Sequence, residues 1–188
     1  NVLGDWRYVF PEGWTDFEEF ADRVTQGDPA LSKLPPAYHG RAVAFKPGGP
    51  YANLLARHNV IMVVGDTLFV HGGVLPHHVR YGFEKINQET QSWMRGERRM
   101  PSMLRGKVSP VWSRHYSKEV RSTTCDVAAQ MLKLAQVKRI VVAHTVQRQG
   151  VNSICGGRVW RVDVGLSAHY KGTVQVLEIK GDQVKVIE

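Results

Sequence analysis

Leu68-Phe-Val-His-Gly-Gly73 is an apolar run that ends in a histidine and two glycines. A second stretch, Ile140-Val-Val-Ala-His-Thr145, follows the same plan. Short apolar runs of this kind are typical of buried strands. In open α/β sheets, ligands bind beyond the carboxyl ends of the strands. The sequence therefore predicts that two separate strands each deliver a histidine, His71 and His144, to a strand end suited to binding.

The remaining pattern predicts a mixed α/β fold with substantial antiparallel β content. Thr15-Asp-Phe-Glu18 has the pattern of a capping box and predicts the start of a helix. Gly65-Asp66 and Gly181-Asp182 predict tight hairpin turns. We expect helices over residues 15–24, 51–57, 75–94 and 118–136, and strands over residues 42–45, 60–64, 67–70, 139–143, 158–164, 173–179 and 183–187.

Length and composition favour an ordinary globular chain. With 188 residues, 43% of them hydrophobic, the chain can bury a core without disulfides, which argues against small secreted scaffolds and disorder. No apolar run approaches the roughly 20 residues that span a bilayer, and no signal peptide is visible at Asn1. Cys125 and Cys155 lack metal-site or redox spacing. We therefore expect an intracellular, non-membrane protein with two reduced thiols.

Positive charge is concentrated in one segment. The chain carries a net charge of 25 − 17 = +8, and Arg95–Arg121 holds eight Lys or Arg against two acids, a local 8 − 2 = +6. Such a segment suits phosphate, although a solvated basic face is the alternative. Aromatic residues are sparse within it, and no nucleic-acid-binding motif occurs. These features argue against a nucleic-acid partner.

The two strand-end histidines suggest metal binding. Neutral imidazole is a common metal ligand, and two of them suit zinc, manganese or iron. Gly72 and Gly73 lack a Cβ, which lets backbone or ligand approach closely. A hydrogen-bonded structural role for both histidines is the alternative. From the residues alone, the sequence predicts a metal site beside a basic loop.

A family resemblance extends this interpretation. Phe69-Val-His-Gly-Gly-Val74 resembles the FVHGG motif of the phosphoprotein phosphatases, and Val142-Ala-His-Thr145 resembles their later histidine segment. Pro110-Val-Trp-Ser-Arg114 resembles the W-x-R segment that supplies a phosphate-binding arginine. The Pro47-Gly-Gly-Pro50 loop and Trp160–Ser167 are most similar to the Shewanella-like phosphatases. The resemblance covers essentially the whole chain.

The resemblance implies a metallophosphoesterase-type β-sandwich flanked by helices (αββα), with its amino-terminal part missing. The family motifs GDxHG, GDxVDRG and GNHE do not occur, so residues 1–188 would be the carboxyl-terminal part of a calcineurin-like phosphoesterase domain. His71 and His144 would bind the second of two divalent ions (Mn, Fe or Zn), and Arg114 would bind phosphate.

Other residues would border that site. Asp163 would orient a ligand histidine or form a turn, and Gly72 and Gly73 would lie beside the metal. We also expect four aromatic residues at the rim: His115, Tyr116, His169 and Tyr170.

The implied function is a Ser/Thr-type phosphoprotein phosphatase that hydrolyses phosphomonoesters with a water activated by two metals. The chain alone would be inactive, because it lacks the first three metal-binding motifs. One alternative is a hydrolase of diadenosine tetraphosphate or another small phosphoester. A second is a noncatalytic module that binds anions through Arg95–Arg121. The resemblance does not distinguish cytoplasm from plastid.

Overall fold

The computed structural model describes residues 11–23, 31 and 34–188, which form two compact units. The first unit comprises residues up to His58 together with Glu89–Met100, and the second comprises Asn59–Gln88 and Pro101–Glu188. Each unit has its own apolar cluster. The chain therefore builds two cores, and the assignment of residues 1–188 to one partial phosphoesterase domain stays a prediction.

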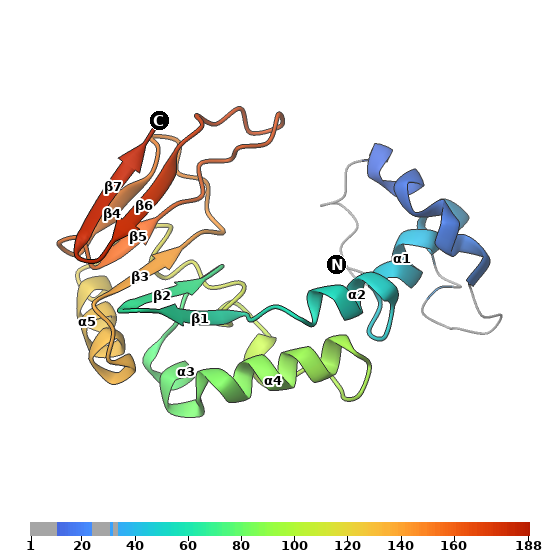
Figure 1. The fold of residues 1–188 in the computed structure, drawn as a ribbon, viewed down its shortest axis with the longest axis horizontal. Helices are drawn as coiled ribbons and strands as arrows, with labels where there is room; N and C mark the ends of the chain where they lie inside the picture. The colour runs from blue at the N-terminus through green and yellow to red at the C-terminus, as the bar shows by residue number, and fades with distance from the viewer. Residues whose placement is uncertain (1–10, 24–30, 32–33) are drawn as a thin grey trace. The chain divides into compact units, whose positions relative to one another are not determined.

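The first unit is helical. Its elements are η2 (Pro11–Arg23), η3 (Pro36–Tyr38), α1 (His39–Phe45), α2 (Pro50–Leu55) and the carboxyl-terminal half of α4 (Figure 1). Phe17, Phe45 and Tyr51 meet edge to face or tilted, with centroids 5.2 to 5.4 Å apart. The expected helix over residues 15–24 corresponds to η2, a kinked 3-10 helix. Val24 and the Thr15 side chain lie outside what the structure describes.

One predicted strand of this unit is wrong. Residues 42–45 form the end of α1, where Ala42, Val43 and Ala44 are buried. A short apolar run fits a buried strand and a buried helix equally well, and alanine favours the helix. The brief helix expected at residues 51–57 is confirmed as α2.

The second unit contains a five-stranded mixed sheet. Its strands are β1 (Ile61–Val64), β2 (Thr67–Val70), β3 (Arg139–Val142), β5 (Val159–Arg161) and β4 (Asn152–Ile154), in the order β1-β2-β3-β5-β4. β2, β3 and β5 run parallel, whereas β1 and β4 pair antiparallel at the two edges. The expected hairpin, with Gly65 at positive φ, is confirmed, and the mixed α/β class with it. β4 was not expected, because its three residues include two polar ones.

The register gives the sheet two distinct faces. Leu68 pairs with Ile140, which pairs with Val159, and all three side chains are fully buried. We call this side of the sheet the inner face. The next row, Phe69 and Val141 with their partners Met62 and Trp160, points the other way and forms the outer face.

Helices cover the inner face. They are α3 (Pro76–Tyr81), α4 (Phe83–Met94, of which residues 83–88 belong to this unit) and α5 (Thr124–Ala135), and a 3-10 turn, η4 (Ser102–Leu104), precedes α5. Ile86, Met131 and Leu132 from these helices pack into the same cluster as Leu68 and Ile140. None of the helices in the described ranges is long and apolar enough to cross a bilayer.

The helix boundaries differ from the prediction at two points. The expected helix over residues 75–94 is divided at Gly82, whose φ of 100° belongs to no helix. The helix expected from residue 118 begins at Thr124, whose hydroxyl accepts a hydrogen bond from the Arg121 amide. This contact supports a turn before the helix and replaces its predicted first turn.

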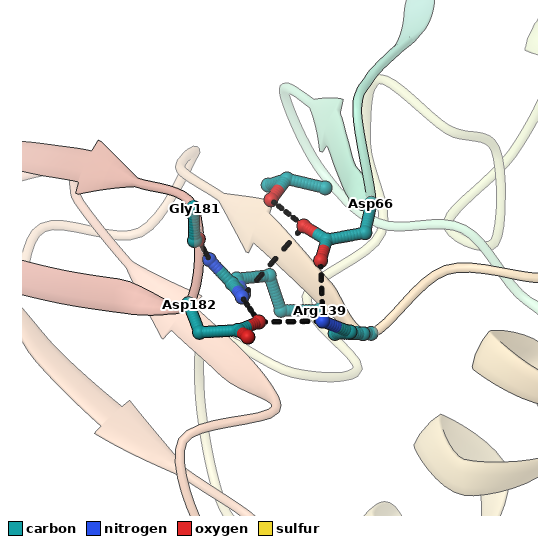
Figure 2. A network of polar contacts seen from close by, with 6 residues as sticks. Asp66, Arg139, Gly181 and Asp182 are labelled. Atoms are coloured by element: carbon teal, nitrogen blue, oxygen red, sulfur yellow. Dashed lines mark hydrogen bonds and ion pairs between the residues drawn. The ribbon is translucent and has the colours of Figure 1, made fainter.

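A separate hairpin, β6 (Val176–Lys180) and β7 (Gln183–Ile187), confirms the last predicted pair of strands. Its turn is held by the buried Arg139, which donates to the Gly181 carbonyl at 2.9 Å and lies 3.5 Å from Asp182 (Figure 2). Arg139 also lies 3.7 Å from Asp66 in the β1–β2 turn. Since Arg139 shares a strand face with Val141, the network fixes the hairpin turn at the outer-face side of β3.

The expectation of two reduced thiols is wrong. Cys125 at the start of α5 and Cys155 just after β4 form a disulfide, with their Cα atoms 5.3 Å apart. The two cysteines are 30 positions apart, so no local spacing indicated that they would pair. Only the fold brings them within disulfide distance.

Candidate functional site

The structure brings His71 and His144 together. β2 and β3 are parallel neighbours, so the residues that follow them lie at the same edge of the sheet. Nε2 of His71 lies 2.9 Å from Nδ1 of His144, and the amide of Ala143 donates to the His71 carbonyl at 2.9 Å. His144 has a φ of 64°, a conformation that few non-glycine residues adopt. Such strain is common at functional sites.

Both histidines are held neutral. Burial lowers the pKa of His71, and the nearby Arg114 lowers it further, while Asp163 opposes both effects. Burial, Arg114 and His71 together lower the pKa of His144 to about 4. At neutral pH each ring therefore keeps a nitrogen lone pair, which metal coordination requires.

The paired nitrogens fit two ligands of one metal ion. Two nitrogens about 2.0–2.1 Å from a tetrahedral ion would lie about 3.3 Å apart, slightly more than the 2.9 Å observed. An opening of a few tenths of an ångström would suffice. Within the described ranges no group of three or more His, Cys, Asp or Glu could hold a metal. These residues thus provide two ligands and no complete site.

The two glycines bring the Arg114 segment to the histidines. The amides of Gly72 and Gly73 both donate to the Pro110 carbonyl, at 2.8 and 3.0 Å. A Cβ on Gly72 would lie 2.7 Å from that oxygen and 2.8 Å from the Ser113 amide nitrogen. The glycines therefore allow close backbone packing, which in turn places Arg114 beside His144.

Arg114 is exposed and tethered to the second histidine. Its Nη1 donates to the His144 carbonyl and to the Thr145 hydroxyl, both at 2.8 Å. The rest of the guanidinium makes no hydrogen bond to the described residues. A cation presented this way beside two neutral imidazoles is suited to an oxyanion.

Four residues around this site were not predicted. Thr145 and Ser117 share a hydrogen bond between their hydroxyls at 2.8 Å, and Gln147 Nε2 donates to the carbonyls of both. The Trp112 ring meets His144 edge to face at 4.8 Å and remains 42% exposed. The W-x-R resemblance pointed to the segment that contains Trp112, and the later histidine segment contains Thr145, but no sequence pattern marked Ser117 or Gln147.

The remaining predicted residues differ in their contacts and burial. An oxygen of the Asp163 carboxylate accepts from the Gly165 amide at 3.1 Å, which is a turn contact, and among the described contacts it bonds to neither histidine. Its orienting role stays a prediction. Tyr116 is wrong as a rim residue, because it is fully buried and donates to the Val74 carbonyl. His115 is half-buried, and Tyr170 is well exposed.

The basic segment is not one surface of one unit. Arg95–Met100 belongs to the first unit and the residues from Pro101 onward to the second. Arg95 pairs with Glu97 at 2.6 Å, and Arg98 lies 3.3 Å from Glu89. The local charge of +6 is therefore divided between the two units. Among the basic residues of the segment, Arg114 has a described hydrogen bond to His144.

An apolar groove of about 390 Å³ opens on the outer face of the sheet. Its walls include Met62, Phe69, Val141 and Val162, and it reaches His71. The hairpin of β6 and β7 is anchored beyond the opposite end of β3, next to Arg139. The histidine site thus borders this groove through His71.

Comparison with known proteins identifies relatives. No family model matches the chain. Shewanella-like protein phosphatase 2 of Arabidopsis thaliana is 35% identical over 97% of the chain and 54% of its own length. The chain is a relative of the Shewanella-like protein phosphatases. An uncharacterised Schizosaccharomyces pombe protein is 29% identical over 100% of the chain and 54% of its own length.

The share of each relative that the chain covers differs. The chain spans about half the length of the plant and yeast proteins. An uncharacterised protein of Acanthamoeba polyphaga mimivirus is 26% identical, and the match covers 97% of the chain and 85% of the viral protein.

Solved structures agree on the fold. A cold-active protein tyrosine phosphatase of a psychrophilic Shewanella species superposes with a TM-score of 0.69 at 21% identity, over 98% of the chain and 52% of that structure. A mutant of a cold-active protein tyrosine phosphatase gives 0.70 at 20% identity, with the same coverage. At such low identity the likeness confirms the α/β fold alone.

Proposed function

We propose that the chain is the carboxyl-terminal part of a metal-dependent phosphoprotein phosphatase of the Ser/Thr type. The observation that supports this most is the pairing of His71 Nε2 with Nδ1 of His144, with Arg114 bonded to the backbone of the same His144. The kinship with Shewanella-like protein phosphatases makes phosphate esters the substrate class to test first.

In this proposal the chain supplies half of one metal site and one phosphate contact. His71 and His144 would hold an ion through their facing nitrogens, and their low pKa values keep both available. Two divalent ions (Mn, Fe or Zn) would lower the pKa of a bridging water and offset phosphoryl charge. Arg114 would donate its free N–H groups to two phosphoryl oxygens.

The proposal also predicts that this chain is inactive alone. Its described part holds no group of three or more potential ligands, so the remaining ligands would come from outside it. Hydrolysis of p-nitrophenyl phosphate with added Mn²⁺ by the 188-residue chain should stay at background. A longer protein that carries the missing motifs should be active.

The decisive assay uses that longer protein with phosphoserine and phosphothreonine peptides. His144→Asn and Arg114→Ala should each lower kcat/KM by about a hundredfold or more, because each removes a group in contact with metal or phosphate. His58→Asn, at an exposed histidine, is the matched control. Full activity in both site variants would refute the proposal.

Trp112 favours a second candidate, hydrolysis of dinucleoside polyphosphates. Its exposed indole lies beside His144, and nucleobases stack on exposed aromatic rings. Cleavage of diadenosine tetraphosphate without turnover of phosphopeptides would replace the first proposal. Salt-sensitive anion binding that survives His71→Ala and His144→Ala, without any hydrolysis, would instead support a noncatalytic module.

A further inference from the structure

The hydrogen bonds of Arg114 divide its guanidinium into a bound side and a free side. A guanidinium has five N–H donors, two of them on Nη1. Those two are used by the His144 carbonyl and the Thr145 hydroxyl, each at 2.8 Å. Nε and Nη2 keep three donors, and their parallel N–H bonds form an edge that matches two oxygens of one phosphate.

The bound side rests on a supported acceptor. The Thr145 hydroxyl accepts from Arg114 and shares a second hydrogen bond with the hydroxyl of Ser117, which is 2% exposed. Gln147 joins the two backbones by donating to the carbonyls of Thr145 and Ser117 at 2.7 and 2.9 Å. The backbone amide of Gln147 in turn donates to the backbone carbonyl of Asp163 at 2.7 Å.

We propose that Thr145 is a positioning residue, whose hydroxyl fixes Arg114 so that the Nε/Nη2 edge faces the phosphate. An exposed arginine samples many rotamers, and binding an anion with it normally requires ordering a long side chain. A guanidinium already held by two acceptors loses less freedom on binding. This inference rests on the proposed phosphate role of Arg114.

The first test observes the guanidinium itself in the 188-residue chain. Nitrogen-15 NMR of the arginine side chains should show slow rotation and slow hydrogen exchange for Arg114. Thr145→Val keeps the shape and removes the hydroxyl, so it should speed both processes. Thr145→Ser restores the hydroxyl and should restore both. Thr173→Val, at an exposed threonine elsewhere in the same unit, is the control and should change neither.

The second test titrates inorganic phosphate while following the Arg114 Nε–H signal. Thr145→Val should weaken affinity about tenfold, the size of one hydrogen bond to a charged group, and Thr145→Ser should recover most of it. In an Arg114→Ala background, with affinity measured by phosphorus-31 NMR, Thr145→Val should add nothing, because Thr145 acts through Arg114.

The outcomes separate the two claims. If Arg114→Ala leaves phosphate affinity unchanged, or the unaltered chain shows no phosphate-dependent shift, the phosphate role of Arg114 fails, and the rotation data alone decide the positioning claim. If Arg114→Ala weakens binding and Thr145→Val does not, Thr145 is not a positioning residue. Should Thr145→Val fail to fold, a folded Thr145→Ser with a mobile Arg114 would equally overturn the proposal.

Discussion

The two faces of the five-stranded sheet are built from the same strands yet have different surroundings. Inner-face Leu68, Ile140 and Val159 are fully buried under helices, whereas outer-face Met62 is 48% exposed and lines an open groove. The chain covers the inner face with its own amphipathic helices. On the outer face it adds a hairpin whose turn is anchored by Arg139, beside the start of β3. The inner face therefore stabilises the fold, and the groove on the outer face borders the candidate site.

The largest expected effect comes from breaking the inner face. Ile140→Ala should lower the free energy of unfolding by about 2–5 kcal/mol, because it leaves a cavity among buried neighbours. Met62→Ala, in the adjacent row, should cost well under about 1 kcal/mol, since its side chain is already half in solvent. Urea unfolding of both variants measures the contrast. Equal losses would contradict the distinction between the faces.

The disulfide joins a helix of the inner face to the edge of the sheet. It closes a loop of 30 positions between Cys125 and Cys155, so removing it should cost about 2–4 kcal/mol. Cys125→Ser with Cys155→Ser, or reduction of the unaltered chain, should lower Tm. Intact mass after alkylation without reductant should show no labelled thiol. Two labelled thiols would show that the bond is absent.

Part of a pH-dependent loss of stability should come from the helix side of the second unit. His78 in α3 is buried, its Nδ1 accepts from the Leu75 amide, and burial lowers its pKa to about 4. The unfolded chain, with an ordinary histidine pKa near 6.5, binds the proton more readily. Stability is therefore complete above about pH 6.5 and falls as the pH drops toward 4.

Between pH 7 and 5 the loss from His78 should be about 1–2 kcal/mol, after allowance for solvent screening. His78→Asn keeps an acceptor for the Leu75 amide and cannot titrate. Urea unfolding across this range should therefore show a flatter pH profile for the variant. An unchanged profile would show that His78 does not contribute to the loss.

The smallest effect concerns the hairpin of β6 and β7, whose turn is anchored by Arg139. Asp182→Asn removes the charge that pairs with Lys138 and Arg139, but Arg139 keeps its bond to the Gly181 carbonyl. Amide hydrogen exchange should rise slightly in β6 and β7 and stay unchanged in β2 and β3. Faster exchange throughout the sheet would mean that the hairpin supports the whole fold.

The sequence could predict the elements that carry a local signal. The hairpins were found because Gly65-Asp66 and Gly181-Asp182 carry a local turn signal, and β3 because its apolar run is uninterrupted. Residues 42–45 were assigned to a strand because four residues are too few to separate a buried strand from a buried helix. β4 was missed because its short, largely polar run carries no strand signal.

The candidate site likewise has a part that the sequence could predict and a part that it could not. His71 and His144 follow recognisable strands, so their convergence at one edge is a consequence of parallel pairing. The bond from Arg114 to Thr145 and the Cys125–Cys155 bridge each join positions about 30 apart. Such contacts depend on tertiary packing and leave no periodic trace in the sequence.

The most direct test of the account asks whether His71 and His144 share one metal ion. Zn²⁺ is titrated into the chain while nitrogen-15 NMR follows the histidine side chains, with exposed His58 and His77 as internal controls. We expect that Nε2 of His71 and Nδ1 of His144 shift together at one equivalent, and that His71→Ala abolishes the response of His144. A shared metal ion would be contradicted if only one of the two histidines responded. It would also be contradicted if neither responded at a lower Zn²⁺ concentration than His58 and His77.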